Sequence, residues 1–173
     1  RVNRLAASEA RYRAVADPLG VPWHVVAIVH SLEGGGFGAH LHNGDPLTAR
    51  TTHVPVGRPV AGNPPFTWEE SAIDAIRSRG WSGATDWSVP GTLYQLEKYN
   101  GFGYRPLGVP TPYLWSFTSQ YSRGKFTSDG QFDPNAVSAQ VGGPALLKRM
   151  AERGPIAAPS GSTLVGPSVF GAG

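Results

Sequence analysis

Two helical segments are predicted in the first fifth of the chain. The segment 4–16 is rich in Ala and Arg, its apolar residues recur at helical spacing, and it ends before Pro18 because the residue preceding a proline disfavours the helical region. A second helix is predicted from Pro22 through WHVVAIVHSLE to Gly34. Apolar residues cover most of its circumference, a pattern typical of a helix at the centre of a domain.

Residues 37–65 have a different pattern. Gly, Pro and Asn alternate there with short β-type pieces such as TARTTHVPV, which predicts a small β-containing lobe. Helical spacing then returns at Thr67 and Glu70, which form a capping box. Further helices are predicted at 68–79, 88–100, 112–121, 133–140 and 144–152.

The pattern as a whole predicts a mainly α fold with a small β-containing lobe inserted after the central helix and a helical lobe towards the C-terminus. A chain of 173 residues fits one compact domain, which we expect over 1–153. Residues 154–173 are rich in Gly, Pro and Ser and are predicted to form a flexible tail or linker.

Composition excludes some chemistry. The chain has no cysteine, so disulfides, thiol catalysis and thiolate metal sites are ruled out. The net charge of +3 is dispersed along the chain and favours polyanionic partners in general. No apolar run approaches the roughly 20 residues of a membrane span, and no signal segment opens the chain, so we expect no stable membrane insertion. We expect a monomer that uses no cofactor.

Glu33 is the candidate catalytic residue. It ends the apolar helix and is followed by three glycines. We expect desolvation and the negative end of the helix dipole to raise the pKa of this carboxyl, so that it holds a proton near neutral pH. Glycoside hydrolysis needs such an acid to protonate the leaving oxygen. An ordinary surface Glu before a glycine helix stop explains the local pattern equally well.

Three strings, AIVHSLEGGGF, HLHNGDPLTART and LEKYNGFGYR, resemble the lysozyme-like superfamily of peptidoglycan-cleaving muramidases, which includes goose-type lysozymes and lytic transglycosylases. In that family the acid ends a central helix and a Tyr-Asn-Gly segment lies across the cleft. The likeness is greatest to a bacterial and phage-borne group with a HLHNGDPLTAR…VPxGRP segment, and it covers about residues 12–152. Many relatives carry Ser after the catalytic Glu, where this chain has Gly34.

The resemblance implies a lysozyme-like α+β fold and cleavage of the MurNAc–GlcNAc β-1,4 bond in the bacterial cell envelope, with peptidoglycan glycan strands as the partner. It implies Glu33 as general acid/base. Asp45 and Thr51 follow in the order of the aspartate and threonine of phage-type lysozymes, although Asn-Gly-Asp-Pro is also a good turn. Without a second carboxylate the same Glu serves a lytic transglycosylase, so hydrolysis and transglycosylation both stay open.

Residues that contact the sugar are expected in two segments. Tyr99, Asn100 and Tyr104 fit the binding of pyranose faces and acetamido groups, although two packed aromatics at a helix stop would give the same pattern. His42 is expected to line the same cleft. Glu97 is expected to pair with a nearby Arg or Lys more readily than to act as a third acid.

Three other classes of function have weaker support in the sequence. The spacing of His30, Glu33, His40 and His42 is unusual for a zinc ligand set, so a zinc peptidase or amidase is disfavoured and no metal is expected. Trp23 and Trp68 fall on apolar helical stripes, and no basic cluster lies beside the tryptophans, so we expect no nucleic-acid binding. A non-catalytic cell-wall glycan-binding module remains open because of Gly34.

Overall fold

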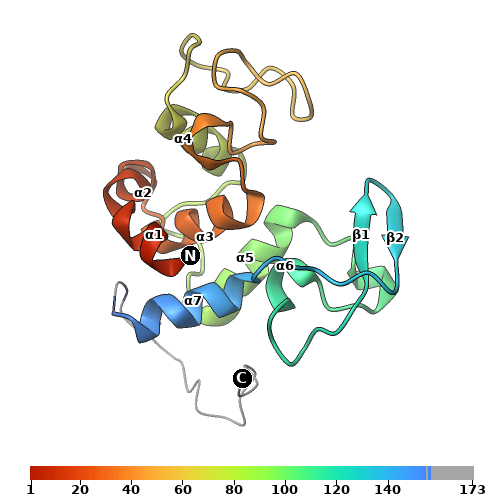
Figure 1. Ribbon diagram of the computed structural model, residues 1–173. Helices are drawn as coiled ribbons and strands as arrows, with labels where there is room; N and C mark the ends of the chain where they lie inside the picture. The colour runs from red at the N-terminus through yellow and green to blue at the C-terminus, as the bar shows by residue number, and fades with distance from the viewer. Residues whose placement is uncertain (155, 157–173) are drawn as a thin grey trace. The chain divides into compact units, whose positions relative to one another are not determined.

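The computed structural model describes residues 1–154 and 156, and the predicted tail therefore lies almost wholly outside the described residues. The chain divides into two compact units, Arg1–Thr85 and the part from Asp86 onward. The described residues form seven α-helices, three 3₁₀ turns and one two-stranded sheet (Figure 1). The class is α+β, as predicted, with helices predominating.

The first unit is built around helix α3 (Trp23–Glu33). The run from Val25 to Val29 is wholly inaccessible to solvent, which confirms the prediction of a central buried helix. Helix α2 (Glu9–Ala16) packs against α3 and against α4 (Trp68–Ser78). The predicted helix 4–16 is interrupted at Ser8, where α1 (Val2–Ala7) ends and α2 begins.

Helix α4 begins with the predicted capping box. The Thr67 hydroxyl accepts from the Glu70 backbone N–H, and the Glu70 carboxylate accepts from the Thr67 backbone N–H. Each side chain thus satisfies a helix-end donor that has no partner inside the helix. The cap fixes where the chain re-enters the helical core after the long loop.

The prediction of a β-containing lobe in 37–65 is wrong. Within this segment the structure has only an isolated bridge between Ala39 and Pro46 and a 3₁₀ turn at Gly36–Gly38. Prolines are frequent here, and a proline has no N–H to donate to a strand ladder. Isolated backbone hydrogen bonds and side-chain hydrogen bonds hold the segment instead of a strand ladder, so it is an ordered loop.

The second unit contains the helices α5 (Val89–Asn100), α6 (Pro112–Trp115) and α7 (Gly143–Glu152), which contact one another, and the hairpin β1 (Lys125–Ser128) and β2 (Gln131–Asp133). In the hairpin Phe126 pairs with Phe132, and a register shift lies between Phe126 and Ser128. The sheet is therefore in the C-terminal half of the chain and not after the central helix.

Two helices predicted in this unit differ from the structure. The helix expected at 133–140 is absent, because the Asp133 carboxylate accepts from the backbone N–H groups of Asn135 and Ala136 and caps a turn after β2. The same Asp-Pro signal begins helices and turns alike. The helix expected at 112–121 ends after Trp115, and Phe117 follows with a φ of 65°.

Candidate functional site

Glu33 lies at the C-terminus of α3, where the helix ends in three glycines of positive φ. Its side chain is exposed, so the part of our prediction that relied on desolvation is wrong. A Cβ placed on Gly34 or on Gly36 would meet no atom within 4 Å. The backbone directly after Glu33 therefore has open space beside it at these two glycines.

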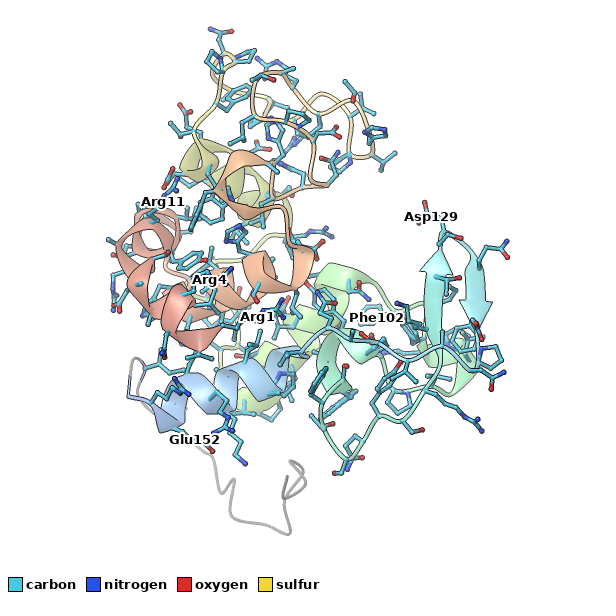
Figure 2. The ribbon with its side chains drawn as sticks, in the orientation of Figure 1. Arg1, Arg4, Arg11, Phe102, Asp129 and Glu152 are labelled. Carbon is cyan, nitrogen blue, oxygen red and sulfur yellow. The ribbon has the colours of Figure 1, made fainter. Side chains whose placement is uncertain are left out.

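A cavity of about 210 Å³ opens beside this turn within the first unit. Its lining includes Ser31, Gly34 and Gly36 next to Glu33, with Arg1 and Arg4 from the start of the chain (Figure 2). The end of α3 thus borders a hollow with cationic side chains in its wall.

His30 belongs to the core under this turn. Its Nδ1 lies 2.9 Å from the Tyr12 hydroxyl, and its ring packs 4.7 Å from the rings of Phe37 and Trp68. Burial raises the pKa of Tyr12 to about 12 and lowers the pKa of His30. The neutral phenol therefore donates to a neutral imidazole, which confirms the prediction that His30 hydrogen-bonds inside the core.

His42 is part of a polar network that ties the long loop to α4. Its Nε2 lies 2.7 Å from Asp74 Oδ2, to which Arg58 Nε also pairs at 2.9 Å. The imidazole is 2% exposed, and burial lowers its pKa against the opposing effect of Asp74. His42 has no open face with which to line a cleft in this unit, and its contacts give it a role in holding the loop.

Asp45 organises the middle of the same loop. Its Oδ2 accepts from the backbone N–H groups of Thr52 at 2.7 Å and His53 at 3.0 Å, and its Oδ1 lies 2.7 Å from His53 Nδ1. Asn43 adds a side-chain contact at 3.3 Å. These hydrogen bonds, chiefly those from His53, hold the pKa of Asp45 well below its usual range. Both oxygens of the predicted second carboxylate are thus engaged within the loop.

Acidification is expected to weaken this loop through Asp45. Because folding lowers the pKa of this carboxyl, its stabilising effect is complete above the ordinary Asp pKa of about 4 and is lost as the pH falls below that value. Asp45→Asn should therefore lower the Tm at pH 7 and have a smaller effect near about pH 3. Calorimetry at the two pH values tests this, and an equal Tm difference at both would contradict it.

Thr51 is also engaged within the loop. It is 2% exposed, its hydroxyl donates to the Pro55 carbonyl, and that hydroxyl accepts from the Arg58 backbone N–H at 2.8 Å. Two further backbone bonds join Thr51 to Gly57 and Arg58. Thr51 closes the 51–58 loop, so its side chain serves the loop's shape.

Of the three predicted sugar-binding residues in the second unit, two line a cavity and one does not. Asn100 and Tyr104 line a cavity of about 530 Å³, whereas Tyr99 is buried and does not line it. Asn100, the last residue of α5, is exposed. The Tyr104 hydroxyl accepts from the Phe126 backbone N–H at 2.9 Å, and burial raises the pKa of this tyrosine.

The hairpin supplies cavity residues that sequence reasoning missed. Lys125, Phe126 and Asp129 line the same cavity, with Asp129 at the turn of the hairpin (Figure 2). Rings of Tyr104 and Phe126 meet edge to face at 5.0 Å. The available signal was the Asp129-Gly130 pair between short runs that each contain an aromatic residue, a common hairpin pattern.

Glu97 pairs with Arg105 through both of its carboxylate oxygens, at 3.0 and 2.8 Å. This confirms the prediction that it takes part in an ion pair. Within residues 1–154 and 156, no three His, Asp or Glu side chains gather as a metal site, and no helix has the length and apolar character to span a membrane.

Comparison with known proteins places the chain in no group: no family model, no curated protein and no solved structure matches it.

Proposed function

We propose that this protein cleaves peptidoglycan glycan strands at the MurNAc–GlcNAc β-1,4 bond, with Glu33 as general acid/base. The observation that carries the proposal is an exposed glutamate at the end of a buried helix, followed by Gly34 and Gly36, whose backbone has open space beside it. The buried helix fixes the backbone of the acid, and the glycines admit a bulky polymer. The likeness of three sequence strings to muramidases points the same way.

The chemistry assigned to Glu33 has two steps. Its protonated carboxyl gives a proton to the bridging oxygen as the bond from that oxygen to the muramyl C1 breaks. The resulting carboxylate then removes a proton from the group that attacks C1. In hydrolysis that group is water, and the product carries a reducing end.

Apart from the reaction at Glu33, we propose that the second unit binds glycan by itself, in its own cavity. Its volume of about 530 Å³ lies in the usual range for small-ligand sites. Asn100 offers an exposed amide for hydroxyl or acetamido groups, and Tyr104 and Phe126 add aromatic surface. A wall with both amide and aromatic groups suits a saccharide, which presents hydroxyls and apolar C–H faces.

Digestion of purified sacculi by the wild-type chain tests the proposal. We expect soluble muropeptides, identified by mass spectrometry, with activity unchanged by a metal chelator. If sacculi bind the protein but release no fragments, the protein is a glycan-binding module and not an enzyme. Activity that a chelator abolishes and zinc restores would favour a metallopeptidase.

A lytic transglycosylase is the second candidate, and the contacts of Asp45 favour it. Both carboxylate oxygens of Asp45 accept hydrogen bonds within its own loop, so this group is not free to activate water. With one catalytic carboxyl, Glu33 would take the proton from the muramyl C6 hydroxyl, which then attacks C1. The same mass spectra decide between the two, since 1,6-anhydromuramyl ends identify transglycosylation and reducing ends identify hydrolysis.

A further inference from the structure

We propose that His53 is a glycan-binding residue that Asp45 holds in position, an inference that rests on the proposed function. His53 lies in the loop 51–58, and no sequence pattern singled it out. Its Nδ1 is 2.7 Å from Asp45 Oδ1, while its side chain is 82% exposed. A ring that is fixed on one side and open on the other is arranged to offer its second nitrogen to a ligand.

The pairing with Asp45 decides which nitrogen is offered. A carboxylate is only an acceptor, so Nδ1 carries the proton and donates it to Asp45. In an imidazole with one N–H, the lone pair is then on Nε2. This nitrogen has no hydrogen-bond partner among the residues that the structure describes. It can accept from a sugar hydroxyl or an acetamido N–H.

The imidazole is not needed to close the loop. Asp45 Oδ2 already accepts from the backbone N–H groups of Thr52 and His53. Thr51 closes the other end through the Pro55 carbonyl and the Arg58 backbone N–H. An exposed contact between an imidazole and a carboxylate adds little stability. The ring is therefore available to contact a ligand without loss of the loop.

The surroundings of His53 indicate a saccharide. Val54 and Val56 follow it in the chain and are 84% and 66% exposed. The hydrogen bonds of Asp45 and Thr51 hold this apolar surface in an ordered loop. A hydrogen-bond acceptor beside exposed methyl groups matches a pyranose, whose hydroxyls and C–H faces lie side by side. A small anion would instead require unpaired cations.

Two variants separate the substrate contact from the structural contact. In His53→Asn the side-chain amide can still donate to Asp45, but the group at the Nε2 position is removed. In His53→Gln the longer side chain places a polar group near the Nε2 position, but the Nδ1 donor is lost. Both are made in the Glu33→Gln background, so that no strand is cut while binding to purified sacculi is measured by sedimentation.

We expect His53→Asn to keep the Tm of its parent and to bind sacculi about 2- to 12-fold more weakly, the loss that one hydrogen bond represents. His53→Gln should bind more tightly than His53→Asn and have an equal or lower Tm. The inference would be overturned if His53→Asn bound sacculi as tightly as its parent. It would also be overturned if, in both variants, the loss of binding were proportional to the loss of Tm.

Failure of the proposed function is recognised separately. If the wild-type chain releases no fragments but the His53 variants bind as expected, the catalytic proposal fails and the glycan contact stands. If the wild-type chain digests sacculi and His53→Asn binds like its parent, only the inference about His53 fails. If no form of the chain binds sacculi, both are overturned.

Discussion

Glu33→Gln is expected to lower the rate of sacculus digestion by about 10²- to 10⁴-fold, the usual contribution of a positioned general acid. Glutamine has nearly the same shape but no proton to give to the bridging oxygen. Because the Glu33 side chain is exposed at the helix end, the substitution should leave the fold intact. The rate is measured as the release of soluble muropeptides, with the far-UV circular dichroism and Tm of both proteins recorded.

Glu9→Gln is the matched control for Glu33→Gln. Glu9 is also a helical glutamate, but it pairs with Arg13 on the surface of α2 and takes no part in the proposed reaction. We expect its digestion rate to stay within about twofold of wild type, since surface substitutions of this kind change stability by less than about 0.5 kcal/mol. Equal rates for wild type and Glu33→Gln would remove Glu33 from the mechanism.

Asp74→Ala is expected to lower the free energy of unfolding by about 2 to 4 kcal/mol. One Asp74 oxygen binds both His42 and Arg58, and its side chain is only 14% exposed. Removing it leaves a buried imidazole and a largely covered guanidinium without their acceptor, a change that costs about 3 to 5 kcal/mol when fully buried. Partial exposure of Arg58 reduces the expected loss. Urea unfolding measures it.

Two comparisons test the cause of that loss. Asp74→Asn keeps an oxygen for His42 but removes the negative charge beside Arg58, so its effect should be smaller than that of Asp74→Ala. Glu9→Ala removes one partner of an exposed pair and should cost at most about 0.5 kcal/mol. A loss for Asp74→Ala no greater than that for Glu9→Ala would show that the network does not stabilise the loop.

Local pattern predicted the helices whose signals lie within the helix itself. Helix α3 follows from an apolar run that ends at glycine, and α4 follows from its capping box. Both features depend on residues within four positions of each other, so the sequence displays them directly. The prediction of a helix at 133–140 failed because Asp133 followed by Pro134 can begin a turn as well as a helix, and here Asp133 caps a turn.

The long loop could not be predicted in this way. His42 is bound by Asp74, 32 residues further along the chain, and His40 by Ser71, 31 residues away. No spacing rule links residues so far apart. The β-type residues of the segment therefore predicted strands, whereas in the folded chain the loop is held by hydrogen bonds within it and by side chains of α4.

In the candidate site, too, the sequence identified some residues and only the folded structure identified others. The resemblance singled out Asp45 by its order after Glu33, but only the folded loop reveals that Asp45 holds His53. In the second unit, Asn100 and Tyr104 were identified from their segment, while Lys125 and Phe126 reach the same cavity from the hairpin.

The amino-acid sequence by itself determined the class of the fold, the buried helix and the position of Glu33 at its end, because apolar periodicity and glycine act over a few residues. Tertiary structure alone decided that Glu33 is exposed, which polar groups His42 and Asp45 bind, and where the sheet lies. The partner of His42 lies 32 residues away, and the partners Thr52 and His53 of Asp45 lie seven and eight residues away, beyond the reach of helix or strand periodicity. Such partners are chosen only when polar groups lose water on folding and must find new donors and acceptors.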